Sequence, residues 1–180
     1  MQDTLNSYGQ IEVGKYRANN NGAGGGTGVQ KFRAINHVRH PDYDDSVCCG
    51  RDGDDEFYGL SHDYMILVLS GESTLPVIEL NTDPTVPRIN QEMHVIGFGD
   101  THPDEYRYRT PNRLHEVTVR HISNERCEQI SIYPSHLLDD TNMCAIDDGE
   151  DACSGDSGGP ILAKGGQSSS DDVQVGIVSW

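Results

Sequence analysis

One segment of the chain contains residues that could carry out covalent catalysis. The ten residues DACSGDSGGP, at 151–160, place Ser157 two residues after Gly155 and directly before Gly158. The small neighbours leave room for a substrate carbonyl, and the backbone N–H groups of Gly155 and Ser157 could turn toward one point. This is the geometry of an oxyanion hole, where one donor contributes roughly 3–4 kcal/mol to the transition state. By composition alone, the segment also suits a tight turn between strands.

A serine is a weak nucleophile and needs a neighbouring base. The chain has eight histidines. His62 directly precedes Asp63, but neighbours on a strand point to opposite faces, so Asp63 should not orient that ring. His37 and His40 lie where a predicted strand runs into a proline turn, and we expect structural roles for them. The residues therefore supply a nucleophile without an identifiable base.

The elements that must position this segment are predicted to be short strands. Apolar segments rich in Val and Ile alternate with turn residues, which is typical of antiparallel strands in a sandwich or barrel. These segments begin at Ile11, Lys31, Tyr64, His94, Leu114, Pro160 and Val173. One helix is predicted to begin at Ser123 or Asn124, because a capping residue precedes good helix formers. Residues 80–91 contain two prolines and are predicted to link two lobes.

Charge and composition exclude several classes of function. The chain has 180 residues, 13 Lys and Arg, and 29 Asp and Glu, which gives a formal charge of −16. A strongly acidic chain is a poor partner for nucleic acid or for an anionic membrane, so we expect neither as a partner. No run of apolar residues approaches the roughly 20 that a spanning helix needs.

The order of several motifs resembles the trypsin-like, chymotrypsin-type family of serine proteases. DACSGDSGGP is similar to the nucleophile segment of that family, and HDYMILVL at 62–69 is similar to its strand with the catalytic aspartate. The other similar segments, in the family's order, are VGKYR at 13–17, AINHVRHPDYD at 34–44, VIGFGDT at 95–101, LHEVTVRHISNERC at 114–127 and VGIVSW at 175–180. The resemblance covers nearly the whole chain.

This resemblance implies a role for individual residues. Ser157 would be the nucleophile, Asp63 would orient the catalytic imidazole, and Gly155 with Ser157 would supply the oxyanion N–H groups. Asp156 would pair with the new N-terminal amine after zymogen cleavage. Cys127 and Cys144 would form a disulfide.

The resemblance also implies a substrate site. Asp151, six residues before Ser157, occupies the family's position at the base of the primary specificity pocket, where a carboxylate favours Arg or Lys side chains. Alternatively, Asp151 only ends the acidic run that begins at Asp147. Ser154, Ser179 and Trp180 would complete the substrate-binding residues.

The implied fold is all-β, with two antiparallel Greek-key barrels. Residues 1–85 would form a partial N-terminal barrel, and residues 86–180 a C-terminal barrel without its last strand and C-terminal helix. The family's histidine segment, its activation sequence and a partner for Cys153 are not found in the sequence. We expect the histidine segment to fall before Met1 and the 180-residue chain alone to be inactive.

The predicted function is therefore a trypsin-like serine endopeptidase that cleaves after Arg or Lys through an acyl-enzyme. Its partners would be protein or peptide substrates and protease inhibitors, and the resemblance implies secretion. The alternative is a non-catalytic protease homologue that binds proteins through the same cleft. No cofactor is expected. No metal is expected either, because Lys15 stands where the first carboxylate of the family's calcium loop would be.

Overall fold

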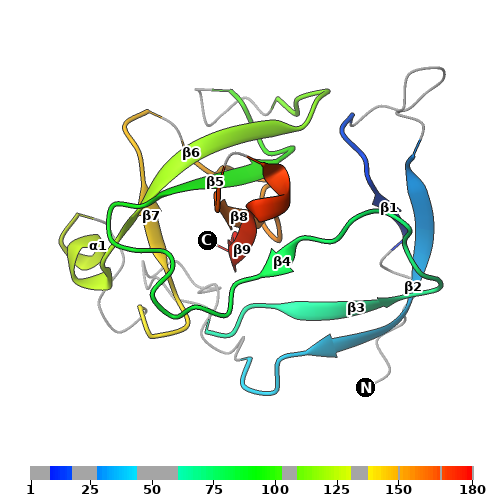
Figure 1. Ribbon diagram of the computed structural model, residues 1–180, viewed down its shortest axis with the longest axis horizontal. Coiled ribbons are helices and arrows are strands. Elements are labelled where there is room, and N and C mark those ends of the chain that lie inside the picture. The colour runs from blue at the N-terminus through cyan, green and yellow to red at the C-terminus, as the bar shows by residue number, and fades with distance from the viewer. Residues whose placement is uncertain are drawn as a thin grey trace, which may run out of the picture.

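The computed structural model describes residues 9–17, 28–43, 61–102, 109–130, 138–149, 151–166 and 168–179. Within these ranges the strands form two sheets, which stand side by side in Figure 1. The smaller sheet comes from the N-terminal part of the chain and the larger one from the rest. None of the described helices has the length and apolar character needed to cross a membrane.

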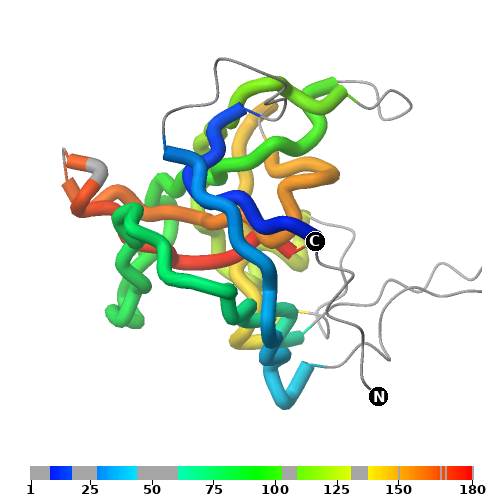
Figure 2. The backbone as a smooth tube through the Cα atoms, turned by 90° about the vertical axis from the view of Figure 1, so that its right-hand side faces the viewer, coloured from blue at the N-terminus to red at the C-terminus, as the bar shows by residue number. Residues whose placement is uncertain are grey.

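The smaller sheet has three antiparallel strands in the order β1-β2-β3. The strands are β1 (Gln10–Val13), β2 (Gln30–Arg39) and β3 (Met65–Leu69). The register of β2 against β3 shifts between Ala34 and Asn36, so β2 holds one extra residue, Ile35, at a bulge. Figure 2 shows β1 and β2 in blue, crossing in front of the larger sheet.

The larger sheet has six strands in the order β4-β9-β8-β5-β6-β7. They are β4 (Glu79–Leu80), β5 (Glu92–Gly97), β6 (His115–Ile122), β7 (Cys144–Ile146), β8 (Pro160–Ala163) and β9 (Val173–Ile177). β4 runs parallel to β9, and the other pairs are antiparallel. Because β4 and β7 are its edges, the sheet is not a closed barrel among the described residues.

The core of the chain lies against the larger sheet. Met93, Val95 and Val119 form the buried cluster, and Met143 and Ile161 are among the half-buried residues that pack against it. Met93 and Val95 alternate along β5 and so point to the same face of the sheet. Ala152, in the loop that carries Ser157, also packs against this cluster.

The helix α1 (Asn124–Ile130) follows β6 directly. It begins where the sequence predicts, because the Ser123 hydroxyl accepts a hydrogen bond from the backbone N–H of Arg126 at 3.2 Å. A disulfide joins Cys127 of this helix to Cys144 at the start of β7, with 6.2 Å between the Cα atoms. A 3₁₀ turn, Ser169–Asp171, precedes β9.

Backbone contacts join the two sheets. The N–H of Leu114 donates to the carbonyl of Tyr16 at 2.9 Å, and Arg17 forms an isolated bridge with Arg113. The chain crosses from one sheet to the other between β3 and β4, because Glu79 already pairs with Val173 of β9. Residues 80–91 were predicted to link two lobes, but Leu80 belongs to β4 and the rest of this segment connects β4 to β5 within the larger sheet. The boundary at residue 85 stays a prediction.

The seven strands expected from the sequence are all present, at 10–13, 30–39, 65–69, 92–97, 115–122, 160–163 and 173–177. Two further strands, β4 and β7, have only two and three residues. Segments this short show no alternation that a sequence pattern could reveal.

Candidate active site

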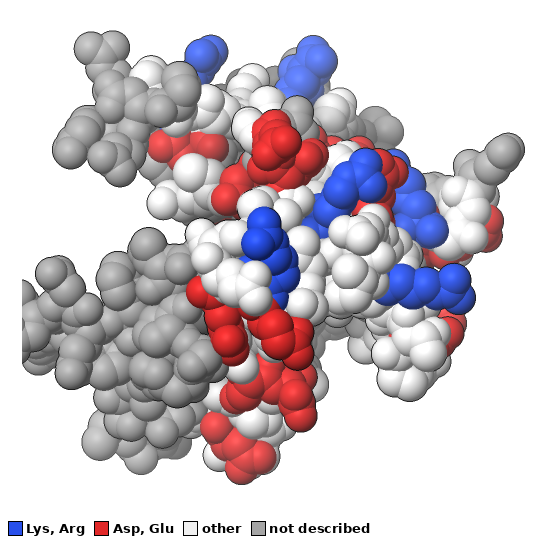
Figure 3. Space-filling model, turned by 90° about the vertical axis from the view of Figure 1, so that its left-hand side faces the viewer, with Lys and Arg blue, Asp and Glu red and all other residues white. Residues whose placement is uncertain are grey.

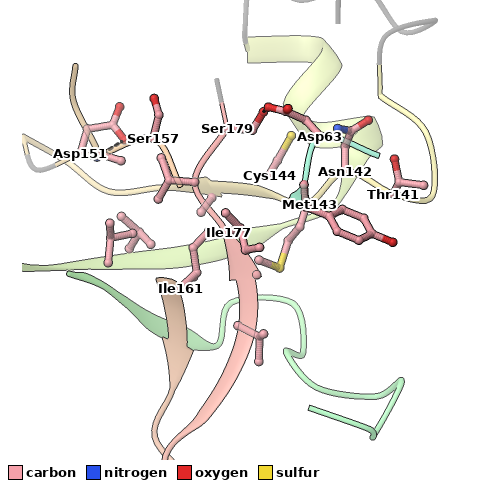
Figure 4. A pocket seen from close by; sticks show the side chains of 18 of the residues that line it. Asp63, Thr141, Asn142, Met143, Cys144, Asp151, Ser157, Ile161, Ile177 and Ser179 are labelled. Atoms are coloured by element: carbon pink, nitrogen blue, oxygen red, sulfur yellow. Dashed lines mark hydrogen bonds between the residues drawn. The ribbon is translucent and has the colours of Figure 1, made fainter. Parts of the chain in front are cut away.

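A cavity of about 830 Å³ opens between the two sheets, and Ser157 lines it. Four other residues assigned to the site from the sequence also line it: Asp63, Asp151, Ser154 and Ser179. Figure 4 shows Asp63 and Ser157 at one rim of the cavity, with Ser179 between them. The deeper wall is apolar and includes Val95, Val119 and Ile161, so the cavity reaches the core of the open sheet.

The loop before β8 presents Ser157 to solvent, and backbone bonds on both sides hold this loop. Gly158 donates its N–H to the carbonyl of Val178 at 2.7 Å, and Val178 donates to the carbonyl of Gly159 at 2.9 Å. Gly155 and Gly158 have φ angles of 100° and 84°, a region that favours glycine. The loop conformation therefore depends on the glycines around the serine.

The backbone N–H groups of Gly155 and Ser157 form no hydrogen bond to the described part of the chain. Both residues are exposed, and Ser157 lines the cavity. Two donors left free next to a serine hydroxyl are what an oxyanion hole requires.

Asp156 anchors this loop to the end of β5. One carboxylate oxygen accepts the N–H of Gly99 at 2.7 Å, and the other accepts the N–H of Cys153 at 3.0 Å. A Cβ on Gly97 would lie 1.8 Å from the Asp156 carboxylate, and one on Gly99 would lie 2.2 Å from it. Glycine is thus required at both positions. The predicted partner, an N-terminal amine, stays a prediction, and two backbone donors satisfy the half-buried carboxylate here.

Asp63 lies just before β3 and reaches across to the end of β9. Its carboxylate accepts a hydrogen bond from the hydroxyl of Ser179 at 2.7 Å, although 116 residues separate the two. This bond joins the smaller sheet to the larger one at the cavity rim (Figure 4). It fixes the direction in which the Asp63 carboxylate points.

The two other predicted substrate residues that the structure describes are exposed at the cavity. Asp151 accepts the N–H of Ala152 at 2.7 Å, and Ser154 lies in the turn that follows. The carboxylate of Asp151 is therefore accessible from the cavity. Trp180 lies outside the described residues.

No described histidine bonds to Asp63 or Ser157. His62 lines the cavity, but its Nδ1 contacts the hydroxyl of Ser61 at 2.8 Å, and its ring stacks on His40. The expectation that Asp63 does not orient this ring agrees with these contacts. The reason differs, since His62 is not in a strand but has a left-handed φ of 55°.

Two polar residues that line the cavity beside His62 were not predicted from the sequence. Thr141 and Asn142 follow Asp139 in a turn before β7, and the Thr141 hydroxyl accepts the backbone N–H of His62 at 3.4 Å. The hydroxyl of Thr141 holds the pKa of Asp139 below its usual range, and the Thr141 backbone N–H and the Ser61 hydroxyl add to this effect. Only the letters DDTN mark this turn in the sequence, and such letters are common in turns.

The predicted disulfide between Cys127 and Cys144 is present. Both cysteines are buried, and Cys153 is an exposed free thiol. Cys48 and Cys49 lie outside the described residues.

Comparisons of the sequence and of the fold with known proteins identify the same family. The family model described as trypsin matches residues 7–180. Rat submandibular glandular kallikrein-3 is 34% identical over 158 residues, which cover 84% of this chain and 76% of the kallikrein. Glucanase inhibitor protein 1 of Phytophthora infestans is 32% identical over 123 residues, or 67% of this chain and 45% of that protein.

Among solved structures, neuropsin, a serine protease expressed in the limbic system of mouse brain, superimposes with a TM-score of 0.70 at 25% identity. The match covers 95% of this chain and 66% of neuropsin. This likeness confirms the predicted all-β fold class, although the two sheets do not close into barrels within the part of the chain that the structure describes. With the family match over 7–180, it shows that the chain belongs to the trypsin family of serine proteases.

Proposed function

We propose that this chain provides the nucleophile and the substrate cleft of a serine endopeptidase that cleaves after Arg or Lys. The observation that carries the proposal is the hydrogen bond between Ser179 and Asp63 at the rim of a cavity that Ser157 also lines. Ser157 would attack the scissile carbonyl, and the N–H groups of Gly155 and Ser157 would stabilise the oxyanion. Asp63 would orient the imidazole that activates the serine.

Asp151 is the proposed specificity residue. Its carboxylate lines the cavity that Ser157 lines and is accessible there. A charge-assisted hydrogen bond to a guanidinium or ammonium group contributes roughly 1.5–3 kcal/mol. Ser154 would lie beside the bound side chain, and Ser179 would border the substrate backbone together with Trp180. The acidic side chains that run down one face of the molecule would attract cationic substrates (Figure 3).

The direct test of Asp151 uses benzamidinium, a planar cation that mimics the arginine side chain. We expect it to bind the 180-residue chain, with affinity falling roughly 10- to 100-fold in Asp151→Ser because the charged hydrogen bond is lost. Asp147→Ser is the matched control, since it removes one exposed carboxylate from the same acidic run. Equal affinities in all three proteins would show that Asp151 does not bind the cation and is not the specificity residue.

The 180-residue chain alone is proposed to lack triad-dependent proteolysis, because no described histidine contacts Asp63 or Ser157. Oxyanion donors and binding would leave at most a residual rate of roughly 10³–10⁴ over water. The test is an assay on an Arg ester with Ser157→Ala as control. A burst of product that the control lacks would overturn this part of the proposal.

The catalytic role itself is tested by supplying the histidine. A fusion that places a histidine segment of the trypsin-like family before Ile11 should hydrolyse an Arg ester, and Ser157→Ala in that fusion should abolish the activity. A folded fusion that still binds benzamidinium but shows no serine-dependent turnover would contradict the proposed endopeptidase activity.

A non-catalytic, protein-binding homologue is the second candidate. One relative is named as a glucanase inhibitor rather than as a peptidase, and no described histidine faces the serine. A folded fusion without turnover that retains cation binding would favour this candidate. For either candidate, we propose peptides or proteins with Arg or Lys as ligands, protease inhibitors as further partners, and secretion.

A further inference from the structure

Three potential metal ligands come together behind the cavity rim. His40, Asp42 and His62 each present one ligand atom, and these atoms lie within 4.8 Å of one another. The first two belong to the turn after β2, and His62 precedes Asp63 at the entry to β3. We propose that these three residues bind a divalent transition-metal ion, with Zn²⁺ as the representative ion.

The fold holds the two imidazoles together before any ion binds. The backbone N–H of His40 donates to the carbonyl of Tyr64 at 3.3 Å, which ties the turn to the start of β3. The rings of His40 and His62 stack with centroids 4.3 Å apart, and the Tyr64 ring lies 4.9 Å from that of His40. Both histidines are half-buried, so much of the cost of ordering them is met in folding.

A second layer of polar groups orients His62. Its Nδ1 lies 2.8 Å from the hydroxyl of Ser61, which also hydrogen-bonds to Asp139 and contacts Thr141. When Nδ1 donates to this hydroxyl, Nε2 carries the lone pair that a metal needs. In metal sites the other ring nitrogen of a histidine ligand usually donates to a carboxylate, a backbone carbonyl or water, and the Ser61 hydroxyl would take that role here.

The donor set determines the class of ion. Two imidazoles and one carboxylate, with water in the fourth position, suit zinc, whereas calcium and magnesium prefer oxygen alone. Zinc bonds of about 2.0–2.2 Å place tetrahedral donors roughly 3.3 Å apart. The cluster must therefore close by roughly 1.5 Å, and the stacked rings must turn apart. Asp42 is exposed and free to rotate, and His40 must release the backbone N–H of Asp42, which its Nδ1 accepts at 3.2 Å.

Metal binding would strengthen the part of the molecule that is least well packed. The ligands join the end of β2 to the start of β3, in a sheet whose three strands contain one buried side chain, that of Ala34. An ion that binds only the folded chain stabilises it in proportion to the logarithm of its concentration. This inference is independent of the proposed protease function, because it involves neither Ser157 nor Asp151.

The test is a titration of the 180-residue chain with Zn²⁺ against a chromophoric chelator, together with the absorption spectrum of Co²⁺. We expect one equivalent to bind, with a tetrahedral cobalt spectrum that lacks a thiolate charge-transfer band. His40→Gln and His62→Asn should each weaken binding at least tenfold. Asparagine is chosen at 62 because it tolerates the left-handed φ of 55°.

His115→Gln is the matched control, since His115 is exposed on β6 and outside the cluster. It should bind Zn²⁺ like the parent chain, and the far-ultraviolet circular dichroism of all variants should match. The proposal is overturned by a thiolate band, by binding that survives both cluster substitutions, or by an equal loss in His115→Gln. Loss of structure in His62→Asn leaves His40→Gln to decide the outcome.

Discussion

The two sheets are built from similar strands but differ in what covers them. In the larger sheet, Met93 and Val119 expose 0% and 1% of their surface. In the smaller sheet, Ile35 and Ile66 expose 57% and 62%. The strands of both sheets are rich in Val and Ile, so composition does not distinguish them. The difference lies in packing, because side chains such as Met143 and Ile161 pack against the buried cluster of the larger sheet.

Alternation along a strand therefore creates an apolar face but does not bury it. Burial of apolar surface contributes about 25 cal/mol per Å², and exposed side chains of the smaller sheet contribute little of it. We therefore expect most of the stability of the chain to come from the larger sheet. The catalytic candidates divide between the two, since Asp63 belongs to the smaller sheet and Ser157 to the larger.

The largest expected effect comes from truncating the same residue type in each sheet. Met93→Ala removes a fully buried side chain and should lower the free energy of unfolding by about 2–5 kcal/mol. Met65→Ala removes a half-buried side chain from β3 and should cost clearly less. Urea denaturation with matched slopes measures both values. Equal losses would show that the smaller sheet is as well packed as the larger one.

Much of the larger sheet could be predicted from sequence. Its long strands follow alternating residues, and Ser123 marks the start of α1. The resemblance of segment 151–160 to the nucleophile segment of trypsin-like proteases predicts that Ser157 lies at a cleft, and Ser157 lines the cavity. These features are local, so the residues that specify them are neighbours in the chain.

Features that depend on distant residues could not be predicted. β4 forms because Glu79 meets Val173, and the cluster of His40 with His62 requires β2 and β3 to pair. The bulge at Ile35 moves it out of alternation with the rest of β2. No pattern within one segment contains this information, because pairing partners are fixed only when the chain folds.

A second comparison uses one glycine from each sheet region. Gly99→Ala places a Cβ 2.2 Å from the Asp156 carboxylate, so this group must move and lose the N–H of Gly99. We expect a loss of about 1.5–3 kcal/mol, the usual range for a hydrogen bond to a charged group. Gly71→Ala meets only Phe32, at 3.4 Å, and should stay within about 1 kcal/mol of the parent. Thermal unfolding of both variants makes the comparison, and similar losses would mean that Asp156 does not anchor its loop.

A smaller effect on stability is expected from the exposed face of the smaller sheet. Ile66→Thr keeps a β-branched side chain at a position that exposes 62% of its surface. The free energy of unfolding should change by no more than about 0.5 kcal/mol. Self-association should decrease, because Ile66 pairs with Val38, which is also exposed, in one apolar patch. Sedimentation at several concentrations measures the self-association. An unchanged association would show that the chains associate through another surface.

The smallest effect concerns Asp139, whose side chain helps to join the two sheets through Ser61. The Thr141 hydroxyl lowers the pKa of Asp139 from its ordinary value of 3.8. A carboxyl with a lowered pKa in the folded state stabilises the fold above its unfolded pKa. That contribution is lost as the pH falls through the lowered folded value. Because Asp139 is exposed, solvent screening keeps the contribution small.

Asp139→Asn should therefore flatten the decline in stability that the parent chain shows between about pH 4 and pH 2, while the remaining carboxyls still contribute to that decline. Asparagine can still accept the Thr141 hydroxyl, so the substitution removes the titrating charge but keeps the turn. Asp140→Asn removes the same charge from the neighbouring residue without touching the bonds to Thr141. Urea midpoints measured across this pH range for the three proteins decide the question. If Asp139→Asn and Asp140→Asn gave the same profile, the contact through Ser61 would contribute nothing specific to holding the sheets together.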